Sequence, residues 1–234
     1  MSKLAFIFPG QGAQKAGMGK DFYENSEAAR SFFDQAQKIL DFDLKEMCFG
    51  EHEELNLTEY TQPCMVSVCL AIVQELKKRG INPDITAGLS LGEYAAVAAA
   101  GGMNELDAIK LVRRRGILMQ STVPAGEGAM AAVLGLDAKK IEEILESFEN
   151  VWIANYNCPG QIVITGLTNE VQQASLALKE AGAKRVVELK VSGPFHSLLL
   201  KPAGEALLKE MESMSFSTLQ VPYVANATAE IVTD

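Results

Sequence analysis

A serine lies between two glycines in the pattern Gly88-Leu89-Ser90-Leu91-Gly92, where its hydroxyl could act as a nucleophile. An attacking serine has to sit at the tip of a tight turn, open to an ester or thioester. Flanking glycines suit this turn, because it needs strained backbone angles and a larger side chain would block the substrate. Ser90 is therefore the candidate nucleophile, and the alternative is an ordinary turn between a strand and a helix.

A serine nucleophile needs a base at neutral pH, and histidine is the usual choice because its pKa lies near 7. The sequence contains two histidines. His52 lies in the acidic stretch Glu51-His52-Glu53-Glu54, which is typical of an exposed surface. By elimination His196 is the candidate base. It follows a glycine- and proline-containing seam, where pockets tend to form, although a histidine there could also cap a helix or pack in a core.

Two further stretches could bind an anion. The loop Pro9-Gly10-Gln11-Gly12-Ala13-Gln14 follows an apolar run, and its glycines leave backbone N–H groups that can point at a ligand. Gln11 is a candidate for that site, and a plain glycine-rich connection is the alternative.

The run Arg113-Arg114-Arg115 stands before Gly116 inside a predicted helix over residues 104–122. Three consecutive helical residues cannot all share one solvated face, so one arginine can point inward. An inward guanidinium binds a carboxylate through a bidentate fork, and Gly116 leaves room for a ligand or another backbone. A structural salt bridge is the alternative.

The elements that must hold these residues follow from hydrophobic patterning. The apolar residues 85–88 predict a strand before Ser90, and the alanine-rich stretch after Gly92 predicts a helix. Residues 4–8 predict a strand buried on both faces of a parallel sheet. Helices are expected over residues 20–50 and from Thr61-Gln62-Pro63 to Gly80.

After residue 129 the pattern changes to strand, helix, two strands, helix and strand, over residues 130–136, 138–148, 151–155, 161–165, 169–181 and 185–191. This β-α-β-β-α-β order is ferredoxin-like, and glycine- and proline-rich seams bound it. We therefore expect an α/β fold with a large parallel-sheet domain, residues 1–127 and 193–234, and an inserted ferredoxin-like subdomain, residues 128–192.

Composition narrows the class of protein. The chain has 234 residues and a formal net charge of −9, which argues against a general nucleic-acid binder. No apolar run is long enough to span a membrane, and the N-terminus lacks a secretory pattern. The four cysteines show no metal-ligand spacing, so we expect reduced thiols, no metal and no cofactor. A cytoplasmic, monomeric protein is expected.

Five motifs in order together resemble the malonyl-CoA:acyl-carrier-protein transacylase family of acyltransferases. They cover nearly the whole chain and are Phe8-Pro9-Gly10-Gln11-Gly12-Ala13-Gln14, Gly88-Leu89-Ser90-Leu91-Gly92-Glu93, Arg115-Gly116 with Met119-Gln120, Asn157-Cys158-Pro159-Gly160-Gln161, and Gly193-Pro194-Phe195-His196-Ser197.

The resemblance implies a fold, an activity and a role for each site residue. The fold would be an α/β-hydrolase-like domain with a ferredoxin-like insert, and the activity transfer of malonyl from malonyl-CoA to acyl carrier protein in fatty acid biosynthesis. Ser90 would carry the acyl group and His196 would be its base. The backbone N–H groups of Gln11 and Leu91 would form the oxyanion hole, and Arg115 would bind the malonyl carboxylate.

The resemblance also implies an acidic carrier protein that could dock on basic clusters. These are Lys110, Arg113, Arg114 and Arg115, and Lys184, Arg185 and Lys190. The sequence departs from the family at Leu89, where many members have histidine. Family members also continue beyond the equivalent of Asp234, and the carbonyl that orients the catalytic histidine is expected in that further part.

Two other functions stay open at this point. A serine hydrolase or thioesterase of α/β type would use Ser90 on substrates without a carboxylate, with an acidic triad member between Ser90 and His196. A non-catalytic module would bind the carrier protein without forming an acyl-enzyme.

Overall fold

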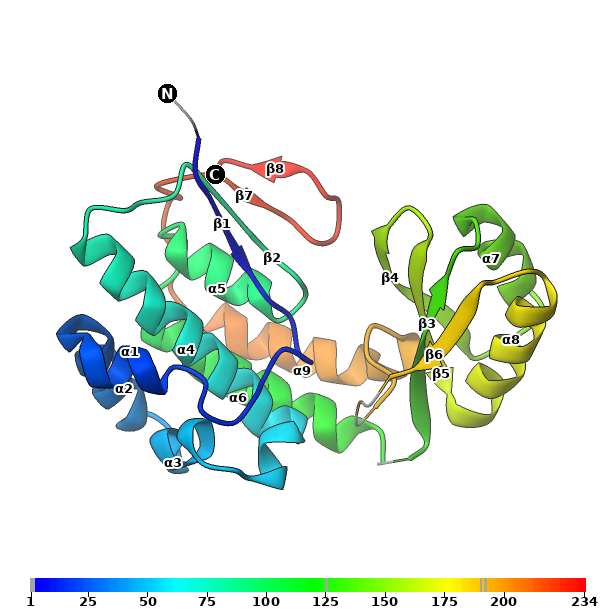
Figure 1. The fold of residues 1–234 in the computed structure, drawn as a ribbon, viewed down its shortest axis with the longest axis horizontal. Helices are drawn as coiled ribbons and strands as arrows, with labels where there is room; N and C mark the ends of the chain where they lie inside the picture. The colour runs from blue at the N-terminus through cyan, green and yellow to red at the C-terminus, as the bar shows by residue number, and fades with distance from the viewer. Residues whose placement is uncertain (1–2, 125, 190, 192) are drawn as a thin grey trace. The chain divides into compact units, whose positions relative to one another are not determined.

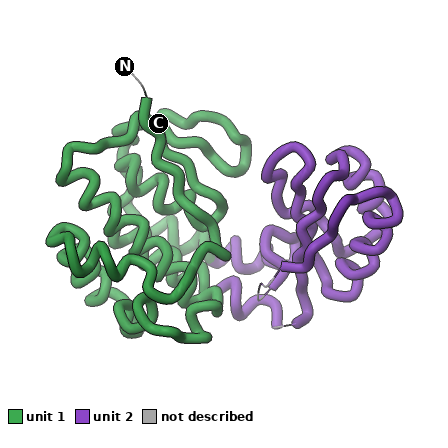
Figure 2. The backbone as a smooth tube through the Cα atoms, in the orientation of Figure 1, with its two compact units in different colours: residues 1–117, 207–234 green, residues 118–206 purple. Residues whose placement is uncertain are grey.

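The computed structural model describes residues 3–124, 126–189, 191 and 193–234, which form two compact units (Figure 2). Unit 1 contains Met1–Ile117 and Leu207–Asp234, and unit 2 contains Leu118–Ala206. The chain leaves unit 1 within helix α6 (Glu105–Thr122) and returns to it within helix α9 (Lys201–Glu212).

The expected subdomain, residues 128–192, lies inside unit 2, whose bounds are wider on both sides. The reason is a small apolar cluster that adds both connecting segments to the unit. Val123, directly after α6, packs in it with Met130 and Val163 of the sheet and with Phe195 and Leu200, which precede α9.

Unit 1 is built on a four-stranded sheet, in the order β1-β2-β7-β8 (Figure 1). Its strands are β1 (Ala5–Phe8), β2 (Ile85–Gly88), β7 (Tyr223–Val224) and β8 (Ile231–Val232). The pairs β1–β2 and β2–β7 are parallel, whereas β8 runs antiparallel to β7. The carboxyl ends of β1, β2 and β7 therefore meet at one edge of the sheet, which is where α/β proteins place their ligands.

Strand β1 differs from the prediction of a strand buried on both faces. It lies at the end of the sheet, and Ile7 is 78% exposed while Phe8 is 5% exposed. Phe6 and Phe8 pack on the helical core, whereas Ile7 alternates to the opposite face. The continuous apolar run therefore reflects one packed face, not two.

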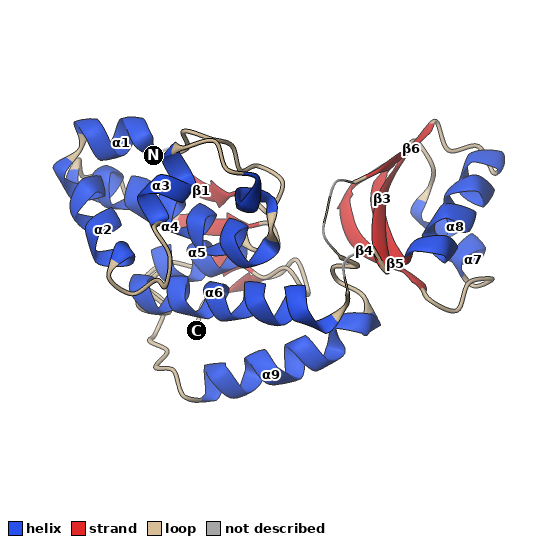
Figure 3. Cartoon of the chain, turned by 90° about the horizontal axis from the view of Figure 1, so that it is seen from below, coloured by secondary structure: helices blue, strands red, loops and turns tan. Residues whose placement is uncertain are grey.

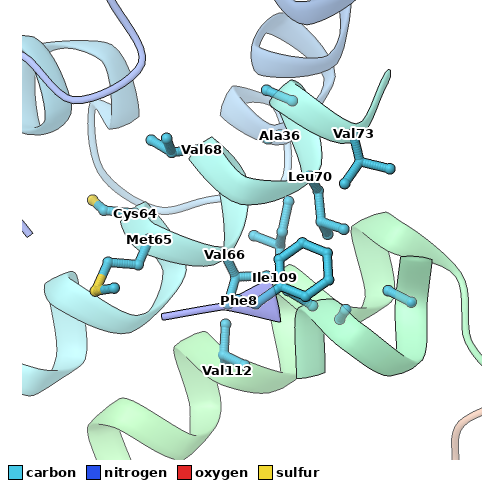
Figure 4. Close-up of a cluster of buried hydrophobic side chains, with 14 of the residues drawn as sticks. Phe8, Ala36, Cys64, Met65, Val66, Val68, Leu70, Val73, Ile109 and Val112 are labelled. Carbon is cyan, nitrogen blue, oxygen red and sulfur yellow. The ribbon is translucent and has the colours of Figure 1, made fainter. Parts of the chain in front are cut away.

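The helices of unit 1 supply that core. They are α1 (Lys20–Asn25), α2 (Glu27–Gln37), α3 (Leu44–Phe49), the 3-10 helix η1 (Glu53–Asn56), α4 (Thr58–Lys78), α5 (Gly92–Ala99), the first part of α6 and the last part of α9. Figure 4 shows Val66 and Leu70 of α4 beside Phe8 of β1 and Ile109 of α6, all almost fully buried. Within the part of the chain that the structure describes, no helix has the length and apolar character that crossing a membrane requires.

Helix α4 begins at Thr58, three residues before the expected start, so that Pro63 lies inside it. A proline has no N–H to donate to the carbonyl four residues earlier, which here is that of Glu59. Arg113 of α6 donates to this carbonyl from Nη1 at 2.7 Å. The side chain of another helix thus replaces the hydrogen bond that proline cannot make.

Unit 2 contains a four-stranded antiparallel sheet with two helices (Figure 3). In chain order its elements are β3 (Gly128–Leu134), α7 (Ala138–Leu145), β4 (Val151–Cys158), β5 (Gln161–Leu167), α8 (Thr168–Glu180) and β6 (Arg185–Glu188). The strands are arranged β4-β5-β3-β6, and Ile141, Ile164 and Leu178 are fully buried between sheet and helices. The order of elements is the predicted one, and the strand boundaries move by a few residues.

Gly116 lies where α6 crosses the first turn of α4. A Cβ added there would lie 2.7 Å from both the Cα of Glu59 and the carbonyl oxygen of Thr58. Of the two uses foreseen for this glycine, the close approach of another backbone is therefore the one found.

We expect Gly116→Ala to lower the free energy of unfolding by about 1–3 kcal/mol, because the added methyl group forces α6 away from α4. Urea denaturation measures this change. Gly204→Ala is the matched control: Gly204 is also helical, but nothing lies within 4 Å of an added Cβ. It should be neutral or slightly stabilising, since alanine is the better helix former. Equal losses in both variants would contradict the close-approach explanation.

Candidate functional site

Ser90 lies at the apex of a three-residue turn between β2, which ends at Gly88, and α5, which begins at Gly92. The predicted strand, turn and helix are therefore confirmed. Ser90 has a φ of 49°, in the left-handed region that residues other than glycine rarely adopt. Among the described residues, the other non-glycine positions with positive φ are His196 and Ala229. Such strain persists only where the surrounding structure fixes it, and it is often found at active sites.

The two glycines of the motif serve a purpose different from the predicted one. The strained angle falls on Ser90 itself, whereas the glycines allow backbone to meet backbone. A Cβ on Gly88 would lie 2.0 Å from the carbonyl carbon of Gly92, and one on Gly92 would lie 2.3 Å from the carbonyl oxygen of Phe8. The pattern is thus required to bring the strand and the helix together within three residues.

The loop after β1 is held against this turn. The backbone N–H of Leu89 donates to the carbonyl of Phe8 at 3.1 Å, and a Cβ on Gly10 would lie 2.8 Å from the carbonyl oxygen of Leu89. Gln11 donates from its side-chain Nε2 to Thr58 Oγ1 at 3.0 Å, which holds the side chain toward α4. The backbones of Gln11 and Leu91 therefore belong to the same edge of the sheet as Ser90.

The consecutive arginines turn to different partners, as the helical geometry predicted. Arg113, with a side chain only 11% exposed, forms a bidentate pair with Asp41 at 2.9 Å for each bond. It also contacts Glu59 Oε2 at 3.1 Å and stacks over the rings of Phe42 and Tyr60, at 5.2 and 4.9 Å. Arg113 therefore has the structural role that the sequence left as an alternative.

Arg114 and Arg115 separate in the same way. Arg114 pairs with Glu210 at 2.9 Å on an exposed part of unit 1. Arg115 places its Nη2 at 3.4 Å from Ser90 Oγ, and its guanidinium carbon lies 5.4 Å from the centre of the Tyr94 ring. Of the three, Arg115 is the one that reaches the candidate nucleophile.

His196 lies in unit 2, in an exposed turn with a φ of 60°. Phe195 beside it is buried, and Ser197 donates from Oγ to the carbonyl of Pro194 at 2.7 Å, so both neighbours are anchored. The helix expected at this point begins later, with a 3-10 turn (Leu198–Leu200) before α9. Ser90, Leu91, Gln11 and Arg115 belong to unit 1, so the pairing of His196 with Ser90 remains a prediction.

Ser90 has one contact that the sequence did not indicate. Its backbone N–H donates to Oδ1 of Asn226 at 2.6 Å. Asn226 lies two residues beyond β7, which is parallel to β2, and this position was the available signal: polar residues after neighbouring parallel strands share one edge.

These groups define the chemistry of unit 1. The hydroxyl of Ser90 lies beside the positive end of α5, and a guanidinium lies within reach of that hydroxyl. The arrangement suits an enzyme that forms an acyl-serine on a negatively charged substrate. No group of three or more histidine, cysteine, aspartate or glutamate residues that could hold a metal occurs among the described residues.

Comparison with known proteins also indicates an enzyme that transfers acyl groups. The family model described as the acyl transferase domain matches residues 5–233, so the chain belongs to the acyl transferase family. The malonyl CoA-acyl carrier protein transacylase of Bacillus subtilis (strain 168) is 47% identical over 239 residues, covering 100% of this chain and 75% of that protein.

Two solved structures are also similar to this chain in sequence and in fold. The malonyl CoA-acyl carrier protein transacylase from Clostridium perfringens superposes with a TM-score of 0.94 at 41% identity, covering 99% of this chain and 74% of that one. A malonyl-transacylase solved in complex with a type II PKS acyl-carrier protein gives a TM-score of 0.95 at 39% identity, covering 100% and 77%.

The Arg113 pair predicts a dependence of stability on pH. Hydrogen bonds from Arg113 hold the pKa of Asp41 below its ordinary value of 3.8. A carboxyl group whose pKa is lower in the folded protein stabilises the fold at pH values above its pKa in the unfolded chain. This contribution to stability is lost as the pH falls through the pKa of the folded protein. Arg113→Met should lower the free energy of unfolding by about 1–3 kcal/mol near neutral pH and reduce its decline toward about pH 3.

Urea denaturation at several pH values measures both effects. Arg114→Met is the control, because its exposed pair with Glu210 contributes about 0–1 kcal/mol. A pH profile of Arg113→Met parallel to that of the wild type would show that Asp41 gains nothing from its partner.

Proposed function

We propose that Ser90 accepts the malonyl group from malonyl-CoA and passes it to the phosphopantetheine thiol of acyl carrier protein. The activity is that of a malonyl-CoA:acyl-carrier-protein S-malonyltransferase, the activity that the relatives are named for, and we assign it to fatty acid synthesis. The observation that carries the assignment of residues is the 3.4 Å distance between Arg115 Nη2 and Ser90 Oγ.

The finer fold assignment belongs to the same proposal. Unit 1 is an α/β-hydrolase-like domain, supported by a nucleophile turn after a parallel strand. Unit 2 is a ferredoxin-like insert, supported by its β-α-β-β-α-β order and its antiparallel sheet.

In the first half-reaction His196 takes the proton from Ser90 Oγ as that oxygen attacks the thioester carbonyl of malonyl-CoA. The C–S bond then breaks, coenzyme A leaves as its thiol with the proton from His196, and malonyl-Ser90 remains. In the second half-reaction His196 takes the proton of the carrier's thiol as its sulfur attacks the ester carbonyl. The C–O bond to Ser90 then breaks, and Ser90 Oγ leaves with that proton from His196. This sequence is a ping-pong scheme, in which water has to be kept from attacking the ester.

The tetrahedral intermediate needs donors for its negative oxygen. Leu91 is the residue that precedes the first turn of α5, so its backbone N–H lies at the positive end of that helix. The backbone N–H of Gln11 comes from the loop that is held against the Ser90 turn. Each such donor contributes about 3 kcal/mol in comparable acyl-transfer enzymes.

Arg115 selects the acyl group. In malonyl-Ser90 a single methylene separates the ester carbonyl from the free carboxylate, so this carboxylate stays within reach of a guanidinium beside Ser90 Oγ. An acyl group without the carboxylate leaves Arg115 unpaired, and hydrogen bonds to charged groups are the stronger ones. Tyr94 supports the guanidinium from one face.

The basic clusters contribute to carrier docking to different extents. Three residues of the first cluster already form ion pairs with acidic residues of this chain, which leaves them less available to a carrier. The pairs are Lys110 with Asp107, Arg113 with Asp41, and Arg114 with Glu210. Lys184 and Arg185 are exposed at the start of β6 and remain the proposed docking residues for an acidic carrier, while Lys190 lies outside the described residues.

Incubation with radiolabelled malonyl-CoA should give a covalent label that survives denaturation, because the intermediate is an ester. Ser90→Ala should carry no label, and peptide mapping should place the wild-type label on Ser90. A carrier-binding module without catalysis would give no label in either protein. Label that persists in Ser90→Ala would point to a different nucleophile.

Arg115→Ala should reduce kcat/KM for malonyl-CoA by roughly 100-fold, the loss expected from two charge-assisted hydrogen bonds. Its kcat/KM for acetyl-CoA should fall much less, so discrimination between the two thioesters narrows. Steady-state kinetics with both substrates measures this, with Arg114→Ala as the neighbouring control. A hydrolase of neutral esters would show equal, small effects on both substrates.

A further inference from the structure

We infer that Asn226 is a positioning residue for Ser90, which fixes the strained turn that carries the nucleophile. This inference rests on the proposed role of Ser90 and assigns a further residue to the same site. Asn226 makes three hydrogen bonds, each to a different part of the turn.

The three bonds span the turn from one end to the other. Oδ1 of Asn226 accepts from the backbone N–H of Ser90 at 2.6 Å. Its Nδ2 donates to the carbonyl of Gly88 at 2.5 Å, where β2 ends. Its own backbone N–H donates to Oε1 of Glu93 at 2.9 Å, in the first turn of α5. One residue therefore ties together the strand, the apex and the helix.

The turn needs such a clamp because Ser90 adopts a left-handed backbone conformation. A non-glycine residue in that region is disfavoured and stays there only when several contacts fix it. Peptide geometry at Ser90 also decides where Oγ points. A hydrogen bond on its own N–H is therefore a direct way to fix the direction of the nucleophile.

Asn226 is itself held firmly enough to act as a clamp. Strand β7 lies beside β2 (Figure 1) and pairs with it in parallel, with Ala87 opposite Val224. Asn226 follows two residues after β7, at the same edge of the sheet. Two backbone hydrogen bonds close the turn to β8. The N–H of Ala225 donates to the carbonyl of Glu230 at 3.0 Å, and the N–H of Ala229 donates to the carbonyl of Ala225 at 2.9 Å. Asn226 thus projects from a closed hairpin.

Asparagine is the side chain that fits these partners. The side chain has to accept a hydrogen bond from one backbone group and donate one to another. An amide can do both, because its acceptor oxygen and its donor nitrogen belong to one planar group. Aspartate keeps the acceptor for Ser90 but cannot donate to Gly88, and it adds a negative charge next to Glu93. Alanine removes both side-chain bonds. The bond also commits the N–H of Ser90 to Asn226, which leaves the oxyanion to other donors.

The test compares Asn226→Ala, Asn226→Asp and Thr228→Ala with the wild type. Thr228 lies in the same hairpin, and its Oγ1 accepts only from the backbone N–H of Glu230 among the contacts described for it, at 3.3 Å. Two readouts are used: hydrogen exchange of the Ser90 backbone amide by NMR, and the single-turnover rate of Ser90 malonylation together with KM.

In Asn226→Ala we expect the Ser90 amide to exchange about 10-fold faster or more, because its acceptor is lost. Malonylation should slow by about 10- to 100-fold with little change in KM, since misplaced reacting atoms lower the rate of the chemical step. Asn226→Asp should lie between Asn226→Ala and the wild type in amide exchange, and Thr228→Ala should match the wild type.

The outcomes separate this inference from the proposed function. Unchanged amide exchange in Asn226→Ala, or a change in KM alone, overturns the positioning role while malonyl transfer stands. A wild type that forms no malonyl-Ser90 overturns the proposed function, and faster amide exchange in Asn226→Ala would still support the clamp. If Asn226→Ala does not fold, Asn226→Asp is judged by the same two readouts.

Discussion

The close approach of backbone to backbone around Ser90 is the constraint on which the rest of the site depends. A strand becomes a helix within three residues, and the contact of Gly92 with the Phe8 carbonyl leaves no space for a side chain. The chain accommodates this with a left-handed residue at the apex. That residue is a serine, so the strain of the connection is borne by the proposed nucleophile, which has to be exposed and fixed in direction.

The arginines of α6 illustrate how one helix can serve stability and chemistry at adjacent positions. Arg113 bonds the Glu59 carbonyl, which Pro63 leaves without its usual helical donor, and so joins α6 to α4. Two residues further along a helix the direction has turned by about 200°, so Arg115 faces away from that joint. The bond from Arg113 to the Glu59 carbonyl thus fixes α6 against α4, on the helix from which Arg115 reaches Ser90.

The features that the sequence predicted correctly are those that depend on local patterns of residues. The strand, turn and helix around Ser90 followed from an apolar run, the two glycines and an alanine-rich stretch. The order of elements in unit 2 followed from periodicity and turn residues. Helical geometry alone could not predict which arginine faces Ser90, because the choice depends on partners at Asp41 and Glu210 that are remote in the sequence. The family resemblance named Arg115, which is the arginine found beside Ser90. Asn226 was missed for a related reason, since only the pairing of β7 with β2 brings it to the turn.

The charges close to Ser90 also explain how the proposed site can bind an anionic thioester although the net charge of the chain is −9. A substrate responds to the charges near the site more than to the total charge of the protein. Close to Ser90 these are the guanidinium of Arg115 and the positive end of α5, both of which favour anions. Glu93 is the acidic side chain that the structure places in the same turn of α5, and its carboxylate accepts the N–H of Asn226. A fixed hydrogen bond of this kind disperses part of its charge, so the residue that supports the turn interferes less with the anion that the site has to bind.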